Sequence, residues 1–189
     1  YYNASVRIRT VLKIAFLLGM ATTIICQLIP SSLGEMFYHR DDLGLYIRLS
    51  SISAPIFFVS NTMVGILNGL NRQSIILRNS IIVSVTEILS LYFFTAIPSI
   101  NIFSYVITIF ITSTLGLLIN LYEIKKHIEL NLSIFNIIIF TLMGILIFLL
   151  LNLMNKYLFN NLYFSKNIIL LLLTFGIFAY LSKFGIDEY

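Results

Sequence analysis

Six long apolar runs constrain this chain more than any other feature of its sequence. A helix needs roughly 20 apolar residues to cross the hydrocarbon core of a bilayer. The chain has 189 residues, of which 59% are hydrophobic and 11% are charged, and its charged fraction is far below that of soluble domains. The sequence therefore predicts an all-α, polytopic membrane helix bundle. The predicted spans cover residues 11–29, 49–70, 79–97, 102–122, 134–154 and 167–182.

The three prolines mark features of these spans. Pro30 closes the first span, and residues 33–48 are expected to form a charged connection with a short interfacial stretch at 45–47. Pro55 lies inside the second span and predicts a kink there, because proline has no backbone N–H. Pro98 opens a short turn between the third and fourth spans, which predicts an antiparallel hairpin.

The distribution of Lys and Arg predicts the orientation, since cytoplasmic connections carry an excess of them. Alternate sides of the membrane receive eight and four basic residues, so both ends of this segment are expected in the cytoplasm. The segment around Asp41 and the Pro98 turn are then expected outside. The larger group is Arg7, Arg9, Lys13, Arg72, Arg78, Lys125, Lys126 and Lys183, and the smaller is Arg40, Arg48, Lys156 and Lys166.

Small and weakly polar residues fall on one face of each of the first four spans. Membrane helices pack through such residues, so these faces are expected to turn inward. The last two spans offer few of them and are expected at the periphery. The four faces are Gly19, Thr22, Thr23 and Cys26; Ser50, Ser53, Asn61, Gly65 and Asn68; Ser80, Ser84, Glu87 and Ser90; and Ser104, Thr108, Thr112, Gly116 and Asn120.

This pattern also predicts the organisation of the chain. We expect a cytoplasmic connection over residues 1–10 and a four-helix core over 11–122. A cytoplasmic loop is expected over 123–133, and a peripheral helix pair with a cytoplasmic tail over 134–189.

Glu87 is the acidic residue well inside a predicted span, where an ionised carboxylate is costly without water or a partner. It is expected to meet a cationic group, to exchange protons, or to line a polar cavity. The alternative is a structural hydrogen bond to Asn61, Asn68 or Ser84 across a helix seam. The candidate substrate-cavity residues are therefore Glu87, Asn61, Asn68 and Ser84.

Motifs of catalysis are absent from the sequence. There is no glycine-rich phosphate loop, zinc-binding helix motif or cysteine cluster, and Cys26 is the only cysteine. His39 and His127 fall on opposite predicted sides of the membrane. We therefore predict no enzyme activity, no catalytic residue, no metal and no cofactor. The basic residues are scattered, which speaks against a nucleic-acid partner.

One segment resembles a known family. The stretch Ile-Ser-Ala-Pro-Ile-Phe-Phe-Val-Ser-Asn-Thr-Met-Val-Gly-Ile-Leu-Asn-Gly-Leu-Asn-Arg-Gln at residues 52–73, followed by Ile-Pro-Ser-Ile-Asn-Ile at 97–102, is similar to the C-terminal half of polysaccharide-type flippases. Residues 65–73 are the most specific part of this stretch. These belong to the multidrug, oligosaccharidyl-lipid and polysaccharide (MOP) exporter superfamily, and the resemblance is strongest to the stage V sporulation protein B group. The chain begins with Tyr1 and shows no signal peptide, so we expect a piece of a longer protein.

The resemblance implies helices nine to fourteen of a two-lobed transporter, with an N-terminal lobe as partner. It further implies that an undecaprenyl-linked saccharide for cell wall, spore cortex or polysaccharide moves across the bacterial cytoplasmic membrane by alternating access. Substrate and membrane lipid would be its other partners. Relatives often carry Lys at the position of Glu87, which puts a phosphate contact there in doubt. The alternatives are a cation- or proton-coupled drug exporter and a non-transporting scaffold or gene fragment.

Overall fold

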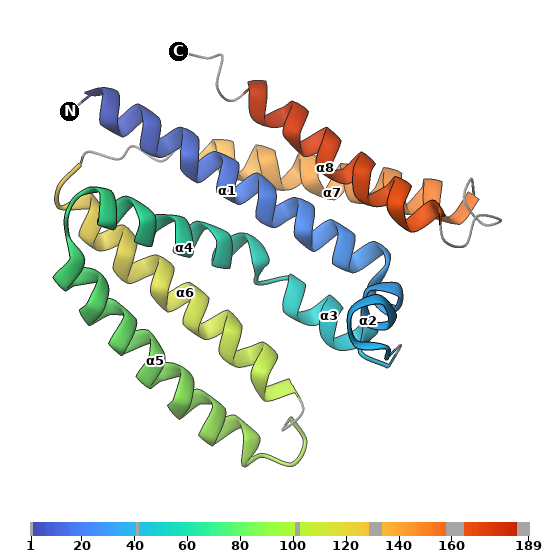
Figure 1. Ribbon diagram of the computed structural model, residues 1–189, viewed down its shortest axis with the longest axis horizontal. Helices are drawn as coiled ribbons and strands as arrows, with labels where there is room; N and C mark the ends of the chain where they lie inside the picture. The colour runs from blue at the N-terminus through green and yellow to red at the C-terminus, as the bar shows by residue number, and fades with distance from the viewer. Residues whose placement is uncertain (1, 41, 101–102, 129–133, 158–164, 185–189) are drawn as a thin grey trace. The chain divides into compact units, whose positions relative to one another are not determined.

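The computed structural model describes residues 2–40, 42–100, 103–128, 134–157 and 165–184. Within these ranges the chain forms eight helices and no strand, which confirms the predicted all-α bundle (Figure 1). The helices are α1 (Tyr2–Leu28), α2 (Pro30–Tyr38), α3 (Gly44–Ser51), α4 (Ala54–Gly69), α5 (Gln73–Thr95), α6 (Ser104–Lys125), α7 (Ile134–Tyr157) and α8 (Ser165–Phe184).

Each predicted span corresponds to one helix or to one pair of helices. Four helices, α1, α5, α6 and α7, are long and apolar enough to cross a bilayer. The pair α3 and α4 counts as a fifth if it forms one broken span. The apolar part of α8, Asn167–Lys183, is shorter. The described chain thus has four or five helices of membrane-crossing length, where the sequence predicted six spans.

The second predicted span is broken near its proline, as expected. The axes of α3 and α4 differ by 54° at this break, and Pro55 lies in the first turn of α4. A proline there leaves α4 intact, since the first N–H groups of a helix have no partner within the helix. The carbonyl four residues earlier, that of Ser51, nevertheless loses the donor that a continuous helix would provide.

Residues 33–48, expected as a charged connection, are largely helical, because they include the end of α2 and most of α3. Pro30 ends α1 but also begins α2, because its fixed φ suits the first turn of a helix. The helix α2 ends at His39, which has the left-handed φ of 53° and donates its N–H to the Glu35 carbonyl. The stretch expected at the interface, residues 45–47, lies within α3.

The chain divides into two compact units. The first comprises residues 1–16 and 53–130, and the second comprises residues 17–52 and 131–189. In the first unit, α6 lies between α4 and α5 and packs against both (Figure 1). The turn after Pro98 joins α5 to α6, and Thr95 Oγ1 lies 3.2 Å from Ser104 Oγ beside it. Arg78 near the start of α5 forms an ion pair with Glu123 near the end of α6, as described below. The two helices therefore run antiparallel, which confirms the predicted hairpin.

The second unit has an apolar core. The second half of α1 contributes Leu17, Ala21 and Ile24, and these pack in one cluster with side chains of α7 and α8. Those partners are Ile147, Leu151, Leu170 and Phe178. The predicted boundaries between a four-helix core and a peripheral pair stay a prediction.

Candidate functional site

The polar face predicted for the fourth span is buried in the structure. Ser104, Thr108, Thr112, Gly116 and Asn120 all lie on the buried side of α6. Gly116 lets α4 come close, because a Cβ built on it would lie 2.8 Å from Ser60 Oγ. The prediction that this ladder forms a helix seam is confirmed.

The predicted face of α4 is largely uncovered. Asn61, Gly65 and Asn68 are exposed, and among the described residues no other helix or side chain lies within 4 Å of a Cβ built on Gly65. Ser60, Met63 and Leu67 form the buried side of α4 instead. The two candidate asparagines therefore share a face of α4 that the described chain leaves open.

The candidate residues of α5 are also outside the buried interior. Ser84 is exposed and Glu87 is partly exposed, whereas the buried residue of α5 is Asn79. Glu87 has no hydrogen-bond or ion-pair partner among the described residues, so the structural bond to Asn61, Asn68 or Ser84 is not formed there. The role of the four candidates in binding a substrate stays a prediction.

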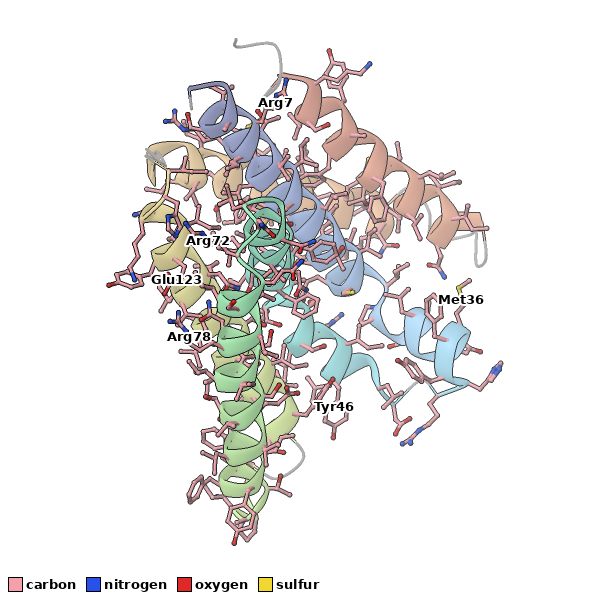
Figure 2. The ribbon with its side chains drawn as sticks, turned by 60° about the vertical axis from the view of Figure 1, so that its left-hand side comes forward. Arg7, Met36, Tyr46, Arg72, Arg78 and Glu123 are labelled. Carbon is pink, nitrogen blue, oxygen red and sulfur yellow. The ribbon has the colours of Figure 1, made fainter. Side chains whose placement is uncertain are left out.

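A polar network at one end of the hairpin was missed by the sequence analysis. Asn79 Nδ2 donates to Asn120 Oδ1 at 2.9 Å in a buried position, and Arg78 Nη2 donates to Asn79 Oδ1 at 3.1 Å. Arg78 also pairs with the carboxylate of Glu123 (Figure 2). Lys126 Nζ adds a contact of 3.5 Å to the same carboxylate. An antiparallel hairpin brings the first two turns of α5 beside the last two turns of α6, and this pairing could have indicated the network from the sequence.

Burial makes Glu123 the anchor of this network. The side chain of Glu123 is 7% exposed, whereas the side chain of Arg78 is 56% exposed. A buried carboxylate needs charged or hydrogen-bonding partners, and Arg78 and Lys126 supply both. The network therefore ties α5 to α6 at the end where the connection to α4 also lies.

A second polar contact lies in the other unit, between α1 and α3. Thr23 Oγ1 lies 2.8 Å from the Ser51 carbonyl and 3.0 Å from the Gly19 carbonyl, within hydrogen-bond distance of both. Gln27 Nε2 donates to the Arg48 carbonyl at 2.9 Å. The carbonyls of Arg48 and Ser51 belong to the last turn of α3, where the helix stops supplying donors.

The connection between α2 and α3 carries an exposed ion pair. Arg40 donates to both carboxylate oxygens of Asp42, and these hydrogen bonds lower the pKa of Asp42 below its ordinary value. The pair lies outside the membrane-crossing helices. The expectations for Asp41, for the loop beyond residue 128 and for the tail beyond 184 fall outside the described residues.

The described residues contain no group of three or more His, Cys, Asp or Glu side chains that could hold a metal. Comparisons of the chain with protein-family models, with curated proteins and with solved structures find no match. The chain is a helical membrane-protein candidate whose spans carry uncovered amide and carboxylate groups.

Proposed function

We propose that this chain is the C-terminal lobe of a polysaccharide-type flippase that moves an undecaprenyl-linked saccharide across the bacterial cytoplasmic membrane. The observation that carries the proposal is the uncovered polar side of α4 and α5. Asn61, Asn68, Ser84 and Glu87 lie on these helices without being buried by the rest of the described chain. The resemblance of residues 52–73 and 97–102 to this family supports the same reading.

Uncovered polar groups at membrane depth need water or a protein partner. An ionised carboxylate at the centre of a span costs several kcal/mol by insertion scales, on the order of 3 kcal/mol, if it faces lipid. A second lobe facing α4 and α5 would enclose these groups in a polar cavity. Amides offer donors and acceptors to sugar hydroxyl groups, and carboxylates offer acceptors, so the two groups together bind sugars well.

The positions of the basic residues fit the orientation that we propose. The pairs Arg78–Glu123 and Arg72–His127 bring the turn after α4 and the end of α6 to the same end of the first unit. Arg72, Arg78, Lys125 and Lys126, which are all predicted on the cytoplasmic side, thus lie at one end of the unit. Residues that share one side of the membrane must lie at the same end of the helices. We place this end in the cytoplasm by the excess of Lys and Arg.

A second candidate function is cation- or proton-coupled export of a drug. The lack of a described partner for Glu87 favours it, since such a carboxylate can bind a cation or exchange a proton. A transport assay separates the two functions, because the second requires a cation gradient and no lipid-linked sugar.

The test is translocation of a fluorescent undecaprenyl-linked saccharide by the full-length protein in liposomes. We expect transport above that of empty liposomes. Glu87→Gln should lower the transport rate at least tenfold, which corresponds to the free energy of about one strong hydrogen bond to a charged group. Glu35→Gln is the matched control, since Glu35 is an exposed acid on α2. Absence of transport by the folded protein, with several glycan lipids tried, would overturn the proposal.

Thiol labelling tests the cavity separately. In a protein whose Cys26 is replaced by Ala, Asn61→Cys should react with a membrane-permeant polar maleimide. Ser60→Cys should not, because Ser60 is its buried neighbour on α4. Equal protection of both positions in the full-length protein would remove Asn61 from the cavity.

A further inference from the structure

A group of basic side chains gathers where α4 ends, α5 begins and α6 ends. We call it the basic end and define it as Arg72, Arg78, Lys125 and Lys126, all exposed or on exposed turns. His127 adjoins it, with Nδ1 3.5 Å from Arg72 Nη2. Figure 2 shows Arg72, Arg78 and Glu123 in this region. Glu123 is the acid that contacts the group among the described residues.

Glu123 balances only part of this charge. Its carboxylate is engaged by Arg78 and Lys126. Arg72 and Lys125 have no acidic partner among the described residues. The basic end therefore keeps an excess of positive charge, and two of its side chains are available to an external anion.

The exposed face of α6 leads from apolar side chains to this charge. Leu118, Tyr122 and Lys125 follow one another at steps of four and three residues, so they lie on one face. Leu118 is 57% exposed and Tyr122 is 63% exposed. Lys126 Nζ lies 4.2 Å from the centre of the Tyr122 ring. The opposite face of the same turns, with Glu123 and Ile124, is buried.

This order of side chains matches the cross-section of one membrane leaflet. Aromatic residues favour the interface between hydrocarbon and headgroups, and basic residues favour the layer of anionic phosphates beyond it. From Leu118 to Lys125 the helix rises roughly 10 Å, enough to pass from hydrocarbon into the headgroup layer. A soluble anion would engage the charges but would gain nothing from the apolar and aromatic part of the face.

We propose that the basic end binds an anionic phospholipid, whose phosphate contacts Arg72 and Lys125 while an acyl chain lies along Leu118 and Tyr122. Glu123 holds Arg78 and Lys126 in place beside this site. The inference requires that α5 and α6 cross the membrane and is independent of the transported substrate. The bound lipid would be a structural partner of the cytoplasmic leaflet.

The test compares the full-length protein in nanodiscs that contain spin-labelled phosphatidylglycerol or spin-labelled phosphatidylcholine. Electron paramagnetic resonance measures the ratio of the two association constants. We expect a preference for phosphatidylglycerol that falls on the order of tenfold in the double variant Arg72→Gln, Lys125→Gln. The control is the double variant Arg48→Gln, Lys156→Gln, which removes two positive charges outside the basic end. Lys156 also lies beside an aromatic ring, that of Tyr157. This control should keep the preference for phosphatidylglycerol.

Two further measurements use the unmodified protein, so the test survives a variant that fails to fold. Sodium chloride at about 1 M should abolish the preference, because it shortens the screening length to roughly 3 Å. Inorganic phosphate in phosphatidylcholine nanodiscs should not raise the melting temperature, whereas phosphatidylglycerol should. Equal lipid preference in the two double variants, a salt-independent preference, or full stabilisation by phosphate alone would overturn the proposal.

Discussion

The hydroxyl of Thr23 on α1 lies 2.8 Å from the backbone carbonyl of Ser51, the last residue of α3. In a continuous helix this carbonyl would accept from the N–H four residues later, but that residue is Pro55. A side chain of another helix thus supplies the donor that the proline lacks. Such compensation is what allows a proline-broken helix in a membrane.

Thr23→Val should therefore destabilise the protein. The change keeps the shape of the side chain and removes its donor, so the free energy of unfolding should fall by about 1 kcal/mol. The measurement is the unfolding midpoint in mixed micelles with increasing sodium dodecyl sulfate. Thr22→Val is the control, because the Thr22 hydroxyl bonds to Leu18 within α1. Identical midpoints for the two variants would mean that the Ser51 carbonyl finds another donor.

The buried carboxylate of Glu123 predicts a larger effect. Glu123→Gln leaves Arg78 and Lys126 without their counter-charge and should lower the free energy of unfolding by about 1–2 kcal/mol. This loss is smaller than for a fully buried ion pair, because the Arg78 side chain is half exposed. Asp42→Asn breaks the exposed Arg40 pair and should cost less stability than Glu123→Gln, because water solvates both partners of that pair. Thermal unfolding in detergent compares both variants, and a larger loss for Asp42→Asn would contradict the assignment.

The Asn79–Asn120 contact should be sensitive to loss of one partner. Asn120→Leu leaves the Asn79 amide without its buried acceptor, which costs about 1–3 kcal/mol. The double change Asn79→Leu, Asn120→Leu should recover part of that loss, since no polar group is then left unpaired. A double-mutant cycle measured by unfolding in detergent gives the coupling. Additive effects of the two single changes would show that the amides do not interact.

Gly116 should tolerate no large side chain. Its Cβ position lies 2.8 Å from Ser60 Oγ and 3.7 Å from Val83 Cγ2, on the neighbouring helices α4 and α5. Gly116→Leu should cost about 1–3 kcal/mol of stability through overpacking. Gly65→Leu is the matched control on α4, where a Cβ would meet no other described helix or side chain within 4 Å. If both variants unfold at the same midpoint in detergent, α4 and α6 are not in close contact there.

A substitution at Thr108 should stabilise the protein, whereas the substitutions above should destabilise it. The residue is 0% exposed and its hydroxyl has no hydrogen-bond partner among the described residues. Thr108→Val removes this unpaired group at constant shape and should raise the free energy of unfolding by roughly 1 kcal/mol. Thr112→Val should not, because the Thr112 hydroxyl donates to the Thr108 carbonyl. A loss of stability in Thr108→Val would mean that the hydroxyl is paired in the membrane.

Local pattern was enough to predict the helices of the six apolar runs and one of the helix seams, but not α2. The six apolar runs predicted the helices that form the spans, and Pro55 predicted the break between α3 and α4. The steps of four residues from Ser104 to Asn120 predicted the buried face of α6. Runs of apolar residues and proline act through the backbone of their own segment, so a sequence window contains what determines them. Helix α2 was not predicted, although its signal is also local, since Pro30 both ends one helix and begins the next.

Which polar faces are covered was decided by tertiary structure. The stripes on α4, α5 and α6 look alike in sequence, yet only that of α6 is buried, because α6 lies between the other two helices. The pairing of Arg78 with Glu123, and of Thr23 with Ser51, also joins residues far apart in the chain. Charge, polarity and helix period are properties of the sequence by itself. The partner of each polar group depends on which helices meet, and that is determined by the packing of the whole bundle.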